Sequence, residues 1–428
     1  MNILSKKPTV AIIGLGYVGL PFLRLLCLKK FNVFGFDIDE DKIRLLKKNE
    51  SYISDIKNNQ LRVVEKDKLF SMKKIEKIKE SDFIILCLPT PLDKRKRPDM
   101  SKIIKAFNTM KPFLKKKQTI ILESTVYPGA TRNIFSPFIS KKFKIGKNFF
   151  IGYSSERISP GQTDVKHYKF SFENTTKVIS GYDTNSLKKI RGLYRLIFKS
   201  LFSADTLEVA EMSKLVENSY RSVNIGLVNE LKVICKKMRI NINKVIETAG
   251  TKPFGYNRFY PGPGVGGHCI PIDPIFLKWS AQNFGVNAKF ISLARSTNLK
   301  ITDWVLREIC NNEPRTKNLK YKKKILLIGL AYKADVNDLR ESPSVKIFKY
   351  LLKYKNLVHY HDNKINNFKI NKKTYNSVNL SNINRYDYVI IGTNHSDLNK
   401  NFILKNSKKI FDTRGLFSKI SSRKVVSI

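Results

Sequence analysis

One cysteine stands in the segment of the chain that is most suggestive of chemistry. Residues 261–274 read PGPGVGGHCIPIDP, so Cys269 follows a run of glycines and Asp273 lies four residues beyond it. Glycines place no side chain in front of the thiol, which lets a substrate approach it closely. A thiol presented in this way can form a covalent adduct with an aldehyde. We therefore expect a shaped loop that exposes Cys269, and we interpret the neighbouring His268 as structural.

A second signal lies near the N-terminus, where three glycines have the spacing G-x-G-x-x-G after an apolar run. The first glycine allows a tight turn, the second lets the backbone approach a pyrophosphate, and the third lets helix and strand pack closely. Asp37 ends the next apolar run, where a carboxylate accepts ribose hydroxyls and repels a 2′-phosphate. The pattern predicts NAD binding rather than a turn without a ligand. The predicted contacts are Gly14, Gly16, Tyr17, Val18, Gly19, Asp37 and Lys42.

Polar residues follow three further apolar runs, at the strand ends where a doubly wound sheet binds its ligands. The hydroxyls of Thr90 and Thr125 are placed to face a nicotinamide or a reacting water, or else they cap loops. Glu156 is placed to act as a general base. The alternative is a salt bridge between Glu156 and Arg157.

Apolar residues recur at steps of three, four or seven between Thr206 and Met238. This spacing predicts one long amphipathic helix that connects domains. Lys214 and Asn218 are four residues apart on it and share a face, so an amine and an amide could meet over one substrate. The alternative is a solvated lysine.

The remaining elements follow from apolar runs and their spacers. Strands are predicted at 10–15, 32–36, 82–88, 119–122 and 149–153, with helices at 20–30 and 101–113 between them. A helix at 298–307 and a polar linker at 311–324 precede further strands at 325–330, 357–361 and 388–392. The alternation predicts an α/β fold in which two Rossmann-like, doubly wound parallel-sheet domains are joined by a long central helix. Lys333 and Arg340 follow a strand of the second domain, and Arg414 closes the last strand of that domain. The three side chains either neutralise phosphates at these strand ends or form ordinary salt bridges.

The composition excludes some classes of protein. The 428 residues carry a formal charge of +45, and so basic a chain first suggests a protein that binds nucleic acid. The lysines are spread along the chain, however, and abundant Lys, Asn and Ile are typical of an AT-rich coding genome. We find no membrane span, no secretory signal and no metal-ligand spacing among the five cysteines. A reduced, cytoplasmic compartment is expected.

Taken in order, these residues resemble the nucleotide-sugar 6-dehydrogenases of the UDP-glucose/GDP-mannose dehydrogenase family over residues 10–414. The segments TKPFG (251–255), FYPGPG (259–264) and GGHCIPIDP (266–274) look most like the branch that oxidises UDP-N-acetylglucosamine. The resemblance implies two NAD⁺ used in turn, with a thiohemiacetal and then a thioester on Cys269. It also implies a role in surface polysaccharide synthesis and a homodimer or dimer-based oligomer. The implied division is an NAD-binding domain at 1–205, a central helical dimerisation and catalytic region at 206–310, and a UDP-sugar-binding domain at 311–428.

The resemblance also assigns roles. Lys214 and Asn218 steady the oxyanion, Asp273 holds water with Lys214, and Glu156 serves hydrolysis with Thr125 beside the water. The implied catalytic residues are Thr125, Glu156, Lys214, Asn218, Cys269 and Asp273. Thr90, Thr125 and Arg340 are added to the cofactor contacts. The implied substrate contacts are Glu156, Arg157, Lys214, Asn218, Arg258, Tyr260, Gly264, Gly266, Lys333 and Arg414.

Alternatives stay open at this point. UDP-glucose and UDP-N-acetylmannosamine are rival substrates for the same chemistry. A basic nucleic-acid-binding protein is the rival from another class, and an inactive family member with a binding role is a third reading. Ser155 and Lys42 depart from the family pattern, which often has proline and arginine there, but neither removes a group that the chemistry requires.

Overall fold

The computed structural model forms two compact units. Unit 1 comprises Met1–Glu217 and Ile275–Gly285, and unit 2 comprises Asn218–Pro274 and Val286–Ile428. The structure describes residues 7–53, 56–157, 173–312, 323–353 and 357–428. Most of the linker predicted at 311–324 therefore lies outside the described residues. None of the helices in the described part of the chain has the length and apolarity needed to cross a membrane.

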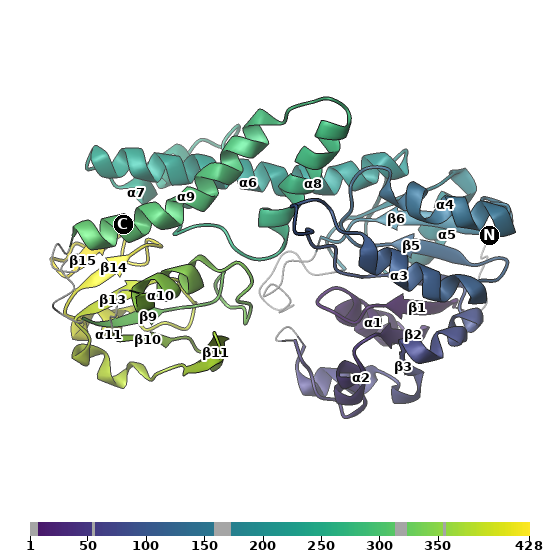
Figure 1. Cartoon of the computed structure of the whole chain (residues 1–428), viewed down its shortest axis with the longest axis horizontal. Helices are drawn as coiled ribbons and strands as arrows, with labels where there is room; N and C mark the ends of the chain where they lie inside the picture. The colour runs from purple at the N-terminus through teal and green to yellow at the C-terminus, as the bar shows by residue number, and fades with distance from the viewer. Residues whose placement is uncertain (1–6, 54–55, 158–172, 313–322, 354–356) are drawn as a thin grey trace. The chain divides into compact units, whose positions relative to one another are not determined.

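Unit 1 is built on an eight-stranded sheet with the order β3-β2-β1-β4-β5-β6-β7-β8 (Figure 1). Its strands are β1 (Thr9–Ile13), β2 (Asn32–Asp37), β3 (Leu69–Ser71), β4 (Phe83–Leu86), β5 (Thr119–Leu122), β6 (Phe150–Ser154), β7 (Lys177–Gly181) and β8 (Leu201–Ser203). The predicted parallel sheet is confirmed with one exception. Strands β6 and β7 pair antiparallel, and neither β7 nor the two short strands β3 and β8 was predicted.

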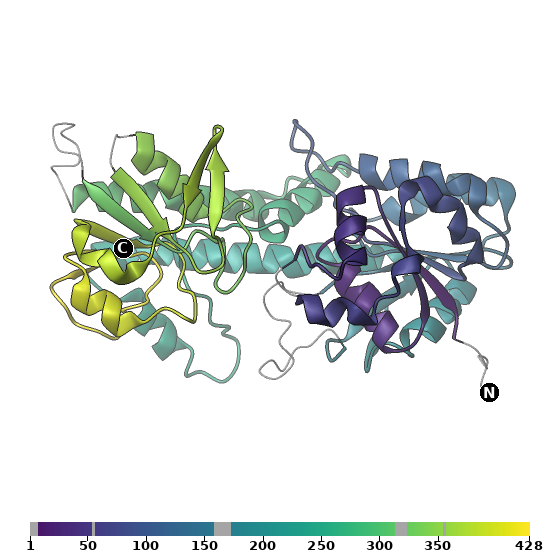
Figure 2. The same ribbon diagram turned by 90° about the horizontal axis from the view of Figure 1, so that it is seen from below.

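Helices cover both faces of this sheet (Figure 2). They are α1 (Gly19–Leu28), α2 (Glu40–Lys47), α3 (Ser101–Met110), α4 (Ala130–Lys142) and α5 (Thr184–Tyr194). Because strand side chains alternate between faces, Val10 and Ile12 share one core with α1 and α5. The helices α3 and α4 meet through the rings of Phe107 and Phe135, whose centroids are 4.9 Å apart.

The predicted long helix is confirmed as α6 (Leu207–Lys237), which passes from unit 1 into unit 2. Its predicted apolar stripe does not form a core throughout. Val209, Val216 and Leu227 expose 51%, 49% and 54% of their surface. The spacing therefore predicted the helix correctly, although it could not say what covers that face. The helix α8 (Cys269–Asn283) also has residues in both units, because Cys269–Pro274 belongs to unit 2 and the rest of the helix to unit 1.

Unit 2 contains a five-stranded sheet with the order β10-β9-β13-β14-β15, in which all neighbours are parallel. Its strands are β9 (Lys324–Ile328), β10 (Leu357–His361), β13 (Tyr388–Ile391), β14 (Ile410–Asp412) and β15 (Val425–Ser427), beside a hairpin of β11 (Asn367–Ile370) and β12 (Lys373–Asn376). Its helices, besides its parts of α6 and α8, are α7 (Ile242–Ala249), α9 (Lys289–Asn311), α10 (Pro343–Lys353) and α11 (Lys400–Asn406). The prediction that Arg414 closes the last strand is wrong, because β15 follows Arg414 in the sequence.

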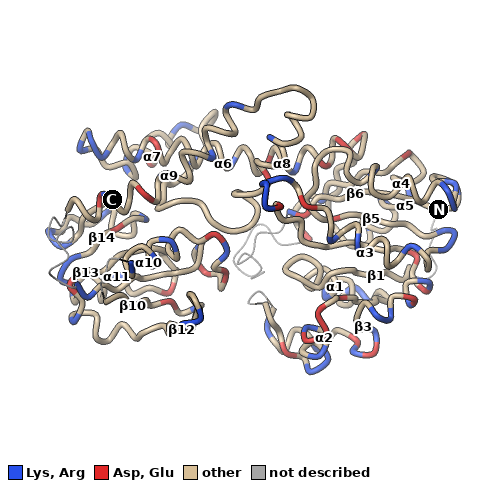
Figure 3. The backbone as a smooth tube through the Cα atoms, in the orientation of Figure 1, with Lys and Arg blue, Asp and Glu red and all other residues tan. Residues whose placement is uncertain are grey.

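The second sheet is also covered on both faces. Leu327 shares a core with Ile347 and Phe348 of α10, whereas Leu326 shares another with Ile403 of α11. The predicted helix at 298–307 is part of the longer α9. Lys and Arg occur in both units rather than in one basic segment (Figure 3).

Candidate active site

The glycine turn between β1 and α1 is packed as the spacing predicts. Gly14 adopts φ +93°, a conformation that strains residues with a side chain. A Cβ on Gly19 would lie 1.9 Å from the carbonyl oxygen of Gly14, whereas a Cβ on Gly16 would meet nothing within 4 Å. The first turn of α1 is therefore held tightly against β1 at Gly19 and is open at Gly16, as the approach of a pyrophosphate requires. Tyr17 and Val18, on the same turn, are half-buried.

Asp37 lies at the end of β2, and its side chain is fixed there. Its Oδ2 accepts a hydrogen bond from the Leu15 amide at 2.8 Å, and its Oδ1 accepts one from the Asp39 amide at 2.9 Å. The Lys42 ammonium lies 3.7 Å from Oδ2. Because each carboxylate oxygen can accept more than one hydrogen bond, Asp37 keeps capacity for ribose hydroxyls. The turn and this carboxylate together fit the adenosine and pyrophosphate parts of NAD.

The loops after β4 and β5 are tied together beside the same turn. The Thr90 hydroxyl donates to the carbonyl of Thr125 at 2.7 Å, and the Leu88 amide donates to the Ser124 hydroxyl at 2.9 Å. Thr90 is 4% exposed. The structure thus brings Thr90 and Thr125 together, and it shows Thr90 in the loop-capping role that the sequence left as an alternative.

Glu156 belongs to a buried network of charged side chains. Lys177 Nζ donates to Glu123 Oε2 at 2.8 Å and to Glu156 Oε2 at 3.1 Å. The Tyr194 hydroxyl donates to the other carboxylate oxygen of Glu123. The side chains of Lys177 and Glu123 expose 4% and 0% of their surface, and that of Glu156 exposes 11%. Glu156 is thus the most accessible of the three charged groups.

The charges of this network follow from its burial. Burial acts to lower the pKa of Lys177, but Glu123 and Glu156 outweigh it and the net pKa is raised. Burial raises the pKa of Glu123, and the nearby charge of Glu156 adds to this effect. We infer that Lys177 stays protonated and that one ammonium is shared between two carboxylates.

Arg157 has partners other than its neighbour Glu156. Its guanidinium donates to Glu217 of α6 and, at 3.0 Å, to the carbonyl of Thr176. Glu156 and Arg157 are therefore held by different elements.

The first half of α6 carries two buried ionisable groups. Lys214 is 9% exposed and Glu211 is completely buried, so the alternative of a solvated lysine is wrong. Glu211 accepts hydrogen bonds from the amides of Gly129 and Thr131 at 2.5 and 2.8 Å, which caps the N-terminus of α4. Burial raises the pKa of Glu211 to about 7.

Cys269 is exposed to solvent. It is the first residue of α8, so the predicted loop ends just before it. A helix N-terminus favours the thiolate form of a cysteine. Asp273 lies one turn further along α8 and is 2% exposed. The amide of Asn218 donates to Asp273 Oδ2 at 2.5 Å, so the structure brings these two predicted residues of unit 2 together.

The glycines before Cys269 are required by packing inside unit 2. A Cβ on Gly266 would lie 2.7 Å from the Tyr332 side chain, and a Cβ on Gly267 would lie 2.7 Å from its ring. The Gly267 amide also donates to the Arg340 carbonyl at 2.8 Å. A Cβ on Gly264 would lie 2.6 Å from the Thr302 hydroxyl. The sequence interpretation, that these glycines clear a path to the thiol, missed this tight contact.

Arg414 joins two loops at the carboxyl edge of the second sheet. Its Nε donates to the Gly392 carbonyl at 2.9 Å, and its Nη2 lies 3.5 Å from the Tyr332 carbonyl. Burial lowers the pKa of Arg414 to about 10. Lys333 is half-buried next to Tyr332.

The other predicted arginines differ in exposure and partners. Arg340 is exposed, and its guanidinium makes a bidentate contact with Asp338 at 2.6–3.0 Å. Arg258 is exposed and donates to the carbonyl of Gly250. Tyr260 exposes 51% of its surface.

The NAD binding domain of the UDP-glucose/GDP-mannose dehydrogenase family matches residues 8–198, the central domain of that family matches 208–300, and its UDP binding domain matches 326–419. The chain belongs to the UDP-glucose/GDP-mannose dehydrogenase family. It is an NAD-dependent nucleotide-sugar dehydrogenase, and the nucleic-acid-binding alternative has no support.

Relatives of this dehydrogenase match nearly end to end. It is 33% identical to UDP-N-acetyl-D-glucosamine 6-dehydrogenase of Pseudomonas aeruginosa, over 95% of this chain and 94% of the relative. It is 32% identical to protein CapL of Staphylococcus aureus, over 96% of both chains. Among solved structures, UDP-N-acetyl-mannosamine dehydrogenase Cap5O of S. aureus aligns with a TM-score of 0.79 and 30% identity, over 98% of this chain and 97% of that one.

Sequence reasoning missed several residues that support the candidate site of the dehydrogenase. Lys177 holds Glu156, Glu123 and Tyr194 complete the network around Lys177, and Glu211 attaches α6 to α4. Lys177 stands directly before the apolar residues Val178 and Ile179. A charged residue at the edge of an apolar run was the one signal in the sequence that could have indicated a buried lysine. Its partners were not predictable, because they depend on the antiparallel pairing of β7.

Proposed function

We propose that the dehydrogenase oxidises C6 of UDP-N-acetylglucosamine to the carboxylate, in two successive steps, for surface polysaccharide synthesis. The observation that carries this proposal is the exposed Cys269 thiol at the N-terminus of α8, in a chain that belongs to a nucleotide-sugar dehydrogenase family. The relative from P. aeruginosa supports the N-acetylglucosamine substrate. UDP-N-acetylmannosamine is the second candidate, because Cap5O acts on that sugar nucleotide.

The cofactor side of the reaction belongs to unit 1. Gly16 leaves the turn open for the pyrophosphate, Asp37 accepts the ribose hydroxyls, and Lys42 lies beside Asp37. Bound NAD⁺ supplies the hydride acceptor for each oxidation. The strand-end residues Thr90 and Thr125 complete this side, and Arg340 is proposed as a further cofactor contact.

The covalent chemistry belongs to Cys269. After the first hydride and one proton leave the C6 alcohol, the thiolate adds to the aldehyde and forms a C–S bond. Loss of a second hydride gives a thioester. Water then breaks the C–S bond, which releases the carboxylate and returns the thiol. One alcohol, one water and two hydride acceptors thus give one carboxylate and three protons.

The remaining catalytic residues act on charge and on water. Lys214 and Asn218, one turn apart on α6, stabilise the oxyanion that develops at C6. Asp273, held by Asn218, orients water together with Lys214. Glu156 acts as the base for hydrolysis, with Thr125 beside the attacking water, and Lys177 holds its carboxylate.

Further residues are proposed to bind the substrate. Lys333, Arg258 and Arg414 supply positive charge for the diphosphate. The further proposed contacts are Arg157, Tyr260, Gly264 and Gly266. We also propose the working division 1–205, 206–310 and 311–428, which assigns cofactor, central and substrate-binding functions in that order.

A homodimer or dimer-based oligomer is proposed from the exposed face of α6. Within unit 1, the side chains of Val209, Met212, Val216, Leu277 and Phe284 line a cavity of about 770 Å³. An apolar surface of this kind is typical of a subunit interface. We place the working enzyme in the cytoplasm, where reduced thiols persist.

The experiment follows NADH absorbance while each of UDP-N-acetylglucosamine, UDP-N-acetylmannosamine and UDP-glucose is supplied in turn. The proposal expects turnover with UDP-N-acetylglucosamine and two NADH per sugar. One NADH per sugar would contradict the covalent scheme. A clear preference for another of the three would move the assignment to that substrate.

A further inference from the structure

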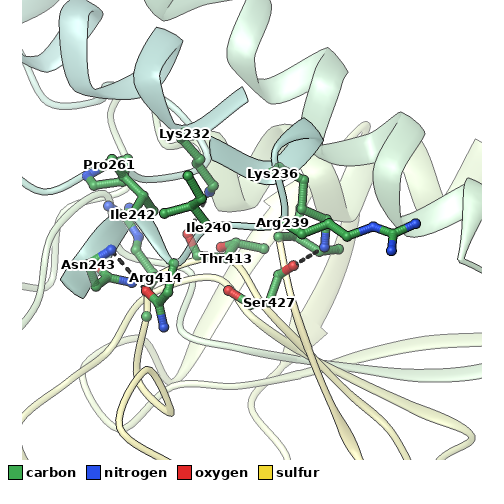
Figure 4. Close-up of a pocket in the computed structure, with 13 residues that line it drawn as sticks. Lys232, Lys236, Arg239, Ile240, Ile242, Asn243, Pro261, Thr413, Arg414 and Ser427 are labelled. Atoms are coloured by element: carbon green, nitrogen blue, oxygen red, sulfur yellow. Dashed lines mark hydrogen bonds between the residues drawn. The ribbon is translucent and has the colours of Figure 1, made fainter. Parts of the chain in front are cut away.

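A cavity of about 480 Å³ in unit 2 is lined by basic side chains (Figure 4). It lies among the end of α6, the start of α7 and the carboxyl ends of β14 and β15. Its charged lining consists of Lys232, Lys236, Arg239 and Arg414, and its amide lining consists of Asn241 and Asn243. Ligands of open α/β sheets bind outside the carboxyl ends of strands, so the position itself is suited to a ligand.

The basic side chains of this cavity form no direct ion pair with a carboxylate in the part of the chain that the structure describes. Lys232 is 4% exposed, and its ammonium donates to the Thr413 carbonyl at 3.1 Å. Lys236 donates to the Ser427 carbonyl. Within the described residues, none of the four basic side chains lies within 4.0 Å of an acidic group. The nearby Asp412 accepts from the amides of Arg414 and Phe417 instead.

The environment of Lys232 is unfavourable for its charge. Burial lowers its pKa to about 7, and the charges of Arg414 and Lys236 add to that effect while Asp412 opposes it. The other neighbour, from α9, is the Trp304 ring, whose centroid is 5.9 Å from the ammonium. A buried charge without a counterion is costly. A bound anion would offset this cost.

We propose that this cavity binds a small phosphorylated anion. Its volume is within the range of about 300–1,000 Å³ that small-molecule sites have. The basic side chains and the two asparagine amides supply donors for phosphoryl oxygens. Among the other lining residues, the apolar side chains of Ile240, Ile242 and Pro261 suit the body of an organic phosphate. The lining contains none of the proposed catalytic residues, and it shares only Arg414 with the proposed substrate contacts.

The first test measures binding of inorganic pyrophosphate to the full chain by titration calorimetry at pH 7 and constant ionic strength. The variant Lys236→Gln/Arg239→Gln removes two charges from the cavity lining. The control variant Lys237→Gln/Lys244→Gln removes two exposed charges from the same region outside it. We expect binding to weaken about tenfold or more in the first variant and less than twofold in the control.

If pyrophosphate binds elsewhere in the enzyme, the two variants should change its affinity equally, and that result overturns the proposal. Absence of measurable binding to the wild type at millimolar pyrophosphate also overturns it. Parallel titrations with inorganic phosphate and uridine monophosphate separate a free anion from a nucleotide phosphate as the preferred occupant.

A second test uses Lys232→Met, which replaces the buried ammonium with an apolar side chain of similar length. Because an anion would raise the pKa of Lys232, pyrophosphate binding at pH 7 should take up part of a proton. Repeating the titration in buffers of different ionisation enthalpy measures this uptake. We expect the uptake to disappear in Lys232→Met while the thermal midpoint is unchanged or raised. Equal uptake in both proteins would exclude Lys232 from the site.

Discussion

Lys177 holds Glu156 through a hydrogen bond of 3.1 Å between Nζ and Oε2. The register of the antiparallel pair β6–β7 explains this contact. Ser154 pairs with Ile179, so extending the register by two residues brings Glu156 opposite Lys177. The one strand pair that departs from a parallel sheet therefore delivers the ammonium that positions the proposed base.

The variant Lys177→Met is expected to lower both activity and stability. It leaves the buried Glu123 without its cation, and breaking a buried pair in this way costs about 3–5 kcal/mol. Loss of the hydrogen bond to Glu156 should slow turnover by roughly 10–100-fold. Steady-state NADH production and chemical denaturation measure the two effects separately.

The matched control is Lys177→Met/Glu123→Gln, which removes the stranded charge as well. We expect it to recover most of the stability but not the turnover, because Glu156 still lacks its donor. Recovery of turnover in the double variant would mean that Lys177 serves only stability.

The variant Cys269→Ser separates chemistry from binding. The thiol is required for the thioester, so steady turnover should fall by roughly 10³-fold. Binding of NAD⁺ should change less than twofold, because the residues proposed to hold it are in other elements. Fluorescence titration with NADH and the absorbance assay measure the two quantities, and a fully active serine variant would refute the covalent scheme.

The carboxyl group of Glu211 should make stability depend on pH. Its pKa is raised by burial to about 7, above the value of about 4.3 expected in an unfolded chain. Between these values the folded state binds more protons than the unfolded state, so stability falls as pH rises from about 4 to 7. The variant Glu211→Gln should flatten this slope in thermal midpoints measured at pH 5, 6, 7 and 8.

The control for that measurement is Glu208→Gln on the same helix. Its hydrogen bond to Arg132 lowers the pKa of Glu208, so its contribution is lost only as pH falls below the unfolded value. The slope between pH 5 and 8 should therefore match that of the wild type. An unchanged slope in Glu211→Gln would show that another group causes the dependence.

Substitution by alanine should have different effects on stability and NAD⁺ binding at two glycines of the same turn. Gly19→Ala places a methyl group 1.9 Å from the Gly14 carbonyl, and such overpacking costs about 1–3 kcal/mol. Gly16→Ala meets open space, so it should fold normally and bind NAD⁺ more weakly, because the methyl group stands where the pyrophosphate approaches. Denaturation curves and NADH titrations distinguish the two, and equal destabilisation would contradict this division.

The sequence predicted the parts of the fold that depend on local patterns. The strands at 119–122 and 357–361 match β5 and β10, and the long helix lies within two residues of its predicted ends. Short strands such as β3 and β8 were missed, because three residues hold too little periodicity. The antiparallel direction of β7 was also missed, since pairing direction depends on distant partners.

The candidate site was predictable where the motif itself carries the chemistry. Cys269, Asp37 and the glycine turn were found from residue type and spacing. The thiol is exposed, Asn218 contacts Asp273 and Lys214 is buried, whereas the catalytic roles of these residues stay proposals. Lys177 and Glu211 act through residues far away in sequence, and only the folded chain shows those partners.

The tight fit of Gly266 and Gly267 against Tyr332 has a practical consequence for mutational scanning of this enzyme. Substitutions there would displace the segment that leads to the Cys269 sulfur, so we expect them to abolish turnover without altering any group that is proposed to react. A screen scored on product alone would rank these positions beside Cys269. Soluble yield and melting behaviour would separate the two kinds of defect.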